Sequence, residues 1–323
     1  MRCKYPYFHS ILLTFIFQIV TFPIWAQVSP FPAIEQKLKI FSNQVMAGSE
    51  DFVRISNSDS LLNEFSRVLT IPGSFEFPFD SLKTVSRLTS EDKHFRIISW
   101  AIPKTDGSYE YSGLIQINSK KKGLKVIKLT DRSDELQGAE NQILLPKNWY
   151  GALYYRIIPI QDKHSSTYTL LGWDGYNGLS KRKLIEILTF KGNDEVFFGA
   201  SAFLHFPRKV KRIIFEYAAN ASMSINYDYQ NVIIRQRNGN KVSISKKLKH
   251  MIVFDRLTAS NPALEGQFQF YLPETNIFDA FVFENGKWNF VKDIDARNAP
   301  KVRKSKIKKV QYDLFQAPEE EKK

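Results

Sequence analysis

One hexapeptide places flat aromatic rings beside side-chain oxygens. It spans residues 173–178, and its members Trp173, Asp174, Tyr176 and Asn177 are the candidate ligand-binding residues. Aromatic faces next to hydrogen-bonding oxygens are typical of sugar sites, and oxygen ligands also suit a hard cation, although a calcium loop uses more carboxylates than this segment holds. The structural alternative is a tight Asp-Gly turn whose tryptophan caps the core. The residues predict either a glycan platform or an ordered hairpin.

Carboxylates are the second group with possible chemistry, because glycoside hydrolysis needs two acids roughly 5–10 Å apart in a cleft. The candidates, several of them on predicted strands, are Asp174, Glu186, Glu216, Asp255, Asp279, Asp293 and Asp295. Spacing does not pair them, and acids near Arg212 or Arg256 also fit surface salt bridges. Arg96, Glu186 and Glu216 each stand among apolar residues, which predicts a buried ionic network that fixes strand register.

The sequence predicts no metal site, no cofactor and no catalytic residue. Outside the N-terminal segment the histidines are His94, His164, His205 and His250. No two of them have the three-to-five-residue spacing of common metal sites. The segment around Ser201 lacks the final glycine of a nucleophile elbow, and phosphate-binding and dinucleotide-binding motifs are absent.

A cluster of cations lies near the C-terminus, and its members are Lys301, Arg303, Lys304, Lys306, Lys308 and Lys309. Such a cluster could contact anionic lipid headgroups or lipopolysaccharide, or it could be a solvated extension. We expect no nucleic-acid partner, because no aromatic residue interleaves with these cations. The sequence does not indicate an oligomeric state.

The N-terminus has the order of a secretory signal peptide. Arg2 and Lys4 precede an uncharged apolar run over residues 11–22, and Ala26 precedes Gln27 after the run ends. The run is shorter than the roughly 20 apolar residues that span a bilayer, although an uncleaved anchor is the alternative. We expect cleavage after Ala26, which removes Cys3, the only cysteine, and leaves no disulfide. The protein is then periplasmic or secreted.

The elements that must position these residues follow from composition and periodicity. The 323 residues are 43% hydrophobic and carry a formal charge of +13, which excludes collagen, coiled coil and wholesale disorder. Apolar spacings of three and four predict one helix over 34–45 and a second over 58–69, with Ser58 as its N-cap. Neither helix carries a chemical motif.

From residue 75 onward, apolar residues recur at every second position. The alternation of Phe75, Phe77 and Phe79 predicts a strand, and many further short strands follow, separated by Asp-Gly and Asn-Gly turns. We therefore predict a mainly β fold, an antiparallel meander that forms a sandwich or closed barrel after two N-terminal helices. An incomplete propeller is the alternative. The expected divisions are a signal peptide (1–26), a helical segment (27–73), a β domain (74–298) and a disordered basic tail (299–323).

Several sequence segments are similar to those of a known protein family. They include FRIISWAIPKTDGSYEYSGLIQ (95–116), WYGALYYRIIP (149–159), YTLLGWDGYN (168–177) and IIFEYAANASMSINYD (213–228). With MIVFDRL (251–257) and KWNFVKDIDARN (287–298), they resemble a family of exported Bacteroidetes proteins without an assigned activity. The resemblance covers about residues 60–298 and implies export, but no site residue.

Together these observations predict an exported, non-enzymatic binding or envelope-associated module. The alternative is a carbohydrate-active hydrolase that uses two strand-borne carboxylates. A pocket with aromatic rings and no acid pair would favour binding, whereas two acids in one cleft would favour hydrolysis.

Overall fold

Two helices precede the sheets, as predicted. The computed structural model describes residues 29–119, 123–160, 166–192, 194–238 and 241–294, and over 231–248 it describes the backbone only. The predicted signal peptide and basic tail lie outside the described residues. The helices are α1 (Phe31–Ala47) and α2 (Asp51–Val68). Among the described residues, no helix combines the length and apolar character needed to cross a bilayer.

The predicted N-cap of the second helix is wrong. Helix α2 begins at Asp51, so Ser58 lies inside it and is buried. The Ser58 hydroxyl instead accepts a hydrogen bond of 2.9 Å from the indole nitrogen of Trp100 in the adjoining sheet. A buried indole N–H needs such an acceptor, and this requirement places a serine in the middle of the helix.

The strand predicted from the alternation of Phe75, Phe77 and Phe79 is also wrong. These residues form turns and irregular chain. Their rings pack under the helices instead: the Phe77 ring stacks on Phe31 of α1 at 5.2 Å, and Phe79 meets Phe65 of α2 edge to face at 5.7 Å. Alternation indicates that alternate side chains are buried, but a strand also needs a hydrogen-bonding neighbour.

Every described strand lies in one of three sheets. The first sheet has the order β1 (Ser86–Thr89), β2 (Phe95–Pro103), β3 (Tyr109–Ser119), β4 (Gly123–Thr130). The central sheet has the order β10 (Ile213–Ala218), β7 (Ser180–Lys191), β6 (Ser166–Asp174), β5 (Leu153–Ile160), with β8 (Glu195–Phe198) also paired to β7. The third sheet has the order β11 (Ile225–Asn238), β12 (Lys241–Ala259), β13 (Tyr271–Glu284), β14 (Lys287–Ile294), β9 (Phe203–Leu204).

The pairing confirms the antiparallel meander. All strand pairs are antiparallel except β14 with β9, and none of the three sheets closes into a barrel. The predicted turns at residues 106–107 and 285–286 join paired antiparallel strands, whereas residues 239–240 lie outside the described residues. Asn285 and Gly286, with φ of 51° and 75°, join β13 to β14, a conformation that Asn-Gly adopts readily.

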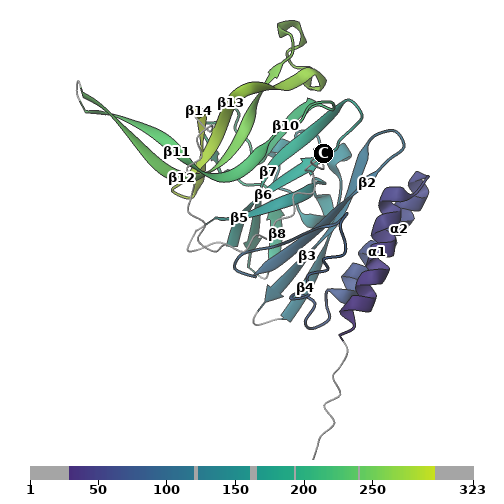
Figure 1. Ribbon diagram of the computed structural model, residues 1–323. Helices are drawn as coiled ribbons and strands as arrows, with labels where there is room; N and C mark the ends of the chain where they lie inside the picture. The colour runs from purple at the N-terminus through teal and green to yellow at the C-terminus, as the bar shows by residue number, and fades with distance from the viewer. Residues whose placement is uncertain (1–28, 120–122, 161–165, 193, 239–240, 295–323) are drawn as a thin grey trace, which may run out of the picture. The chain divides into compact units, whose positions relative to one another are not determined.

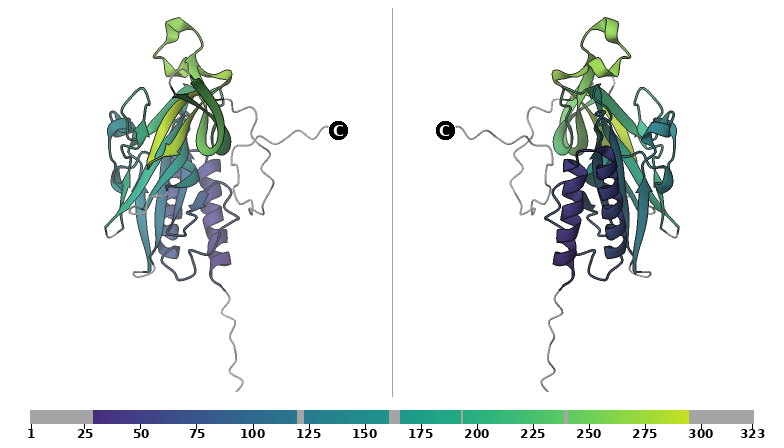
Figure 2. Two further views of the ribbon diagram at one scale, coloured as in Figure 1. Left: turned by 90° about the vertical axis from the view of Figure 1, so that its left-hand side faces the viewer. Right: turned by 90° about the vertical axis from the view of Figure 1, so that its right-hand side faces the viewer.

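The layers follow from the alternation of side chains along each strand (Figures 1 and 2). On β2, Ile98 and Trp100 pack against the helices, whereas Phe95 and Ile97 pack into the core shared with the central sheet. Figure 2 shows α1 and α2 side by side along the first sheet.

The central sheet is covered on both faces. Leu170 and Leu184 join the core shared with the first sheet, while Leu171 and Ile185 join a second core with residues of the third sheet such as Phe254. The fold is therefore sandwich-like, with stacked sheets rather than the blades of the propeller alternative.

The predicted ionic network divides into separate contacts. The Arg96 guanidinium is buried and donates to Gln116 Oε1 (2.7 Å) and to the carbonyls of Ser74 and Phe77. It thus ties the chain that follows α2 to the first sheet. Glu216 pairs with Arg182 of β7, and Glu186 pairs with Arg212, which directly precedes β10. Burial lowers the pKa of Arg96 to about 10, so it stays charged at neutral pH.

Candidate functional site

The hexapeptide forms the turn that joins β6 to β7. Asp174 is the last residue of β6, and Ser180 begins β7. Asn177 Oδ1 accepts hydrogen bonds of 2.9 Å from the backbone N–H groups of Leu179 and Ser180. Tyr176 adopts a φ of 53°. The side-chain oxygen of Asn177 is therefore engaged in holding the turn.

Trp173 packs inward from this turn. Its side chain is half-buried against the core between the first and central sheets. Its ring meets Tyr109 of β3 edge to face at 5.4 Å. Gly175 is required beside them, because a Cβ there would collide with the Tyr109 ring. The aromatic pair thus joins the β6–β7 turn to the first sheet.

Asp174 is buried and bonded within the protein. Its Oδ1 accepts from the Tyr176 N–H at 2.8 Å, and its Oδ2 accepts from the Tyr150 hydroxyl at 3.0 Å. Burial raises the pKa of Asp174 to about 6, against the lowering effect of these hydrogen bonds and of Arg182, and the carboxyl of Asp131 raises it further.

Arg182 links this buried carboxyl to the surface. Its guanidinium donates to the Tyr150 hydroxyl at 3.0 Å and to Glu216 Oε2 at 2.8 Å, and it lies 3.2 Å from the centre of the Tyr176 ring. Ser180 Oγ donates to the other oxygen of Glu216 at 2.7 Å. The chain of contacts from Asp174 to Glu216 fixes the turn.

A groove with a volume of about 330 Å³ lies beside the turn. Its walls come from the end of the hexapeptide turn, from the end of β10 with the chain that follows it, and from the segment between β12 and β13 with the start of β13. The lining residues are Gly178, Leu179, Ala218, Ala219, Asn220, Ser260, Gln269, Phe270 and Leu272. The large apolar side chains among them are exposed, Leu179 to 71%, Phe270 to 40% and Leu272 to 38%.

The wall between β12 and β13 is internally fixed. Asn261 Oδ1 accepts from the Ala263 N–H at 2.9 Å and so caps a short 3-10 helix, Pro262–Leu264. The Ser260 N–H donates to the Phe270 carbonyl at 2.9 Å, which closes the loop. These bonds hold Phe270 in place before any ligand arrives.

Sequence reasoning did not identify this wall. The segment 260–272 carries three aromatic residues, Phe268, Phe270 and Tyr271, close to an Asn-Pro step and a glycine. Aromatic residues within a turn-rich segment were the available signal. Of the four predicted ligand residues, Asp174 is buried and Trp173 is half-buried against the core, and the groove is lined by the neighbouring Gly178 and Leu179 instead.

The predicted acids do not meet in this groove. None of the described lining residues is an acid. Glu186 is fully buried with Arg212, while Asp279 and Asp293 share Arg256. Asp255 accepts from the Ser224 N–H, and Asp295 lies outside the described residues.

Metal-ligating groups do not gather in the described part of the chain, where no cluster of three histidine, cysteine or acidic residues could hold an ion. His94 Nδ1 lies 3.3 Å from the Tyr168 hydroxyl, and His250 stacks on Tyr227. His164 and the six clustered cations over 301–309 lie outside the described residues.

Comparison of the chain with known protein families, with curated proteins and with solved structures finds no match. The functional interpretation therefore rests on the groove and its walls.

Proposed function

We propose that this protein is an exported, non-enzymatic binding module that holds a neutral glycan in the groove beside the β6–β7 turn. The observation that carries the proposal is the lining of that groove: an exposed phenyl ring, Phe270, with the amide side chains of Asn220 and Gln269 and the hydroxyl of Ser260. An aromatic face packs against the C–H face of a sugar ring, and amides and hydroxyls both donate to and accept from sugar hydroxyls.

The charges near the groove support a neutral ligand. The described lining residues carry none, and the neighbouring Arg182 and Glu216 neutralise each other at 2.8 Å. Without an acid to protonate a leaving group or a second acid to assist, the groove supports binding and not glycoside hydrolysis.

Export is the other half of the proposal, and it rests on the N-terminal segment and on the family resemblance. Cells that express the whole chain should yield an envelope or secreted form that begins at Gln27. N-terminal sequencing of that fraction checks this expectation. Recovery of the intact chain in the cytosol alone contradicts it.

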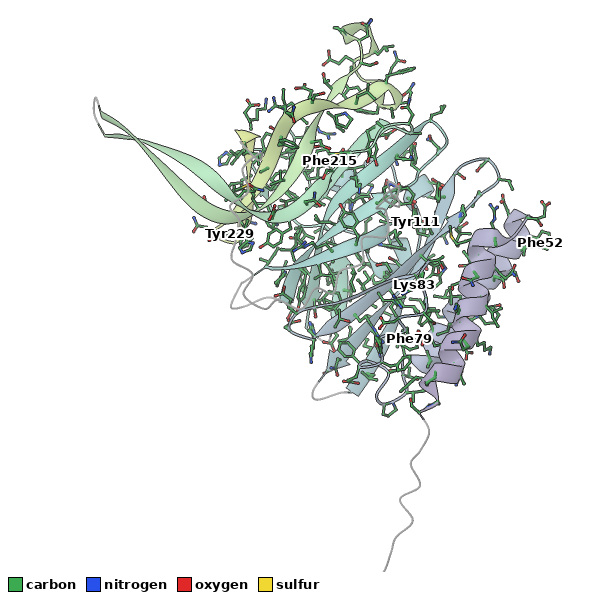
Figure 3. All side chains as sticks on the ribbon, viewed as in Figure 1. Phe52, Phe79, Lys83, Tyr111, Phe215 and Tyr229 are labelled. Carbon is green, nitrogen blue, oxygen red and sulfur yellow. The ribbon has the colours of Figure 1, made fainter. Side chains whose placement is uncertain are left out.

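The binding test compares two exposed phenylalanines. Phe270→Ala should weaken binding about tenfold, the loss expected for one aromatic contact. Phe52→Ala is the matched control, because Phe52 is 73% exposed on the outer side of α2 (Figure 3) and should leave affinity unchanged. Isothermal titration against cello-, malto- and xylo-oligosaccharides measures the affinities.

Two controls separate binding from the alternatives. Unfolding free energies of both variants should stay within about 0.5 kcal/mol of the parent, because neither ring is in a core. Incubation with the bound glycan should release no new reducing ends. New reducing ends would support the hydrolase alternative, and equal affinity of the parent and Phe270→Ala would remove the groove as the site.

A further inference from the structure

Strands β11 and β12 extend beyond the rest of their sheet. They pair with each other from Ile225↔Phe254 to Asn238↔Lys241. Strand β13 pairs with β12 only from Met251 onward along β12, and β11 is the outer strand of the sheet. Figure 1 shows the resulting two-stranded ribbon in green, running past the ends of its neighbours. We call residues 231–238 and 241–248 the ribbon.

The ribbon has little support of its own. Eight residues per strand at about 3.3 Å per residue give a reach of roughly 25 Å. A two-stranded hairpin is only marginally stable in water, and within the described part of the chain no third strand pairs with the ribbon. We therefore expect the ribbon to bind a partner.

Charge indicates the class of that partner. From Tyr229 to Phe254 the sequence has no aspartate or glutamate, and its basic residues are Arg235, Arg237, Lys241, Lys246, Lys247 and Lys249. Five of these six basic residues lie within the ribbon. The sixth, Lys249, lies just outside it and pairs with Glu284. The partner surface is therefore anionic.

The remaining residue types distinguish between anionic partners. The ribbon's large apolar residues are all aliphatic: Val232, Ile233, Ile234, Val242, Ile244 and Leu248. Single-stranded nucleic acid is usually held by aromatic stacking, and residues 231–248 contain no aromatic residue. Cations mixed with aliphatic residues are typical of elements that lie at a bilayer interface.

The base of the ribbon carries the aromatic residues. Tyr227 and Tyr229 of β11 flank His250 of β12, with ring centres 5.2 and 4.7 Å from the histidine ring. Figure 3 shows Tyr229 at the base of the ribbon. The Arg156 guanidinium lies 5.2 Å from the Tyr227 ring. Tyrosine is enriched at the headgroup level of membranes, because its ring is apolar and its hydroxyl is polar.

We infer that the ribbon is a contact of this protein with an anionic lipid bilayer. The cations of the ribbon bind headgroup phosphates, its aliphatic residues enter the interface, and Tyr229 marks the depth of contact, whereas Tyr227 packs against the core beside Trp288. This contact is independent of the glycan groove, which lies between other loops.

The test is flotation with vesicles of phosphatidylcholine alone or of equal parts phosphatidylcholine and phosphatidylglycerol, using the whole chain. Neutralising four ribbon cations to glutamine should lower partition into the anionic vesicles at least about tenfold, because each basic residue near an anionic surface contributes roughly a factor of five. The ribbon variant combines Arg235→Gln, Arg237→Gln, Lys246→Gln and Lys247→Gln. The matched control removes the same charge from other strands and loops through Lys125→Gln, Lys128→Gln, Lys147→Gln and Lys209→Gln.

Partition unchanged in the ribbon variant, or an equal loss in the control, overturns the proposal. So does equal binding of the parent to both vesicle types. Competition by duplex DNA or inorganic phosphate that abolishes vesicle binding would assign the ribbon to a different anion.

A second measurement does not depend on the folding of the fourfold variant. Gln236→Cys, in a chain whose Cys3 is replaced by serine, carries a polarity-sensitive fluorophore on the ribbon. Its emission should shift to the blue with anionic vesicles, while the same label at Lys209→Cys should not respond. An unshifted ribbon label contradicts the inference.

Discussion

Asp174 is a buried carboxyl whose protonation should control stability in mild acid. Its pKa is about 6 in the folded protein, against about 3.9 for an unfolded aspartate, because burial disfavours the charged form. The folded state therefore binds more protons than the unfolded state between these values. The free energy of unfolding should fall as the pH rises from about 4 to about 6, by up to about 2–3 kcal/mol from this residue.

Asp174→Asn isolates this contribution. The groups that face the carboxyl are Tyr150, Tyr111, Arg182 and Asp131, and the pKa of Asp131 is also raised by burial. Urea unfolding across this pH range should give a flatter profile for the asparagine variant than for the parent. Parallel profiles would show that Asp174 titrates as an ordinary aspartate.

Trp173 is half-buried, so its removal should cost less than the loss of a core tryptophan. Truncation of a buried tryptophan costs about 3–5 kcal/mol, and Trp149, which is fully buried, provides that reference. Trp173→Ala should lose about 2 kcal/mol, mainly its contact with Tyr109. Denaturant melts of Trp173→Ala and Trp149→Ala compare these losses. A melt unchanged by Trp173→Ala would favour the predicted ligand platform.

At the scale of elements, Glu186 and Arg212 connect β7 to the chain beside it. Both side chains are fully buried, and Arg212 Nε lies 2.8 Å from Glu186 Oε1. The same guanidinium donates to the carbonyls of Ala139, Gln142 and Phe198. One side chain thus joins two chain segments, residues 139–142 and the end of β8, to Glu186 of β7.

Glu186→Gln should cost about 3–5 kcal/mol, because it leaves the buried guanidinium without its counter-charge. Glu195→Gln on β8 is the matched control, since that carboxylate is exposed and the change should stay within about 0.5 kcal/mol. Equilibrium unfolding measures both variants. Equal small losses would mean that the carbonyls alone satisfy Arg212.

The helices and strands were predictable where side-chain alternation and turn residues alone determine the local structure. Alternation and Asn-Gly chemistry located the hairpin of β13 and β14. They failed over residues 75–79, where alternate rings are buried under helices without a strand partner. The turn at residues 173–178 was found, but not the groove beside it, because its opposite wall is more than eighty residues away in sequence.

At the scale of the whole molecule, the first and central sheets are covered by different elements. The first sheet is covered by helices on one face and by the central sheet on the other. The central sheet is covered by a sheet on each face, so the segment Leu184–Leu188 is entirely buried. Periodicity shows that a face is buried but does not show what buries it, and the stacking order therefore could not be read from the sequence.

Hydrogen exchange should report this layering. Amides of β6 and β7 should exchange most slowly, because they open only when both cores open. The ribbon should exchange fastest among the described strands, because its hydrogen bonds join only two strands. Adding vesicles of equal parts phosphatidylcholine and phosphatidylglycerol should slow exchange in residues 231–248 and leave the central sheet unchanged. Exchange that slows equally throughout would indicate general stabilisation, and an unaffected ribbon would show that this element does not meet the bilayer.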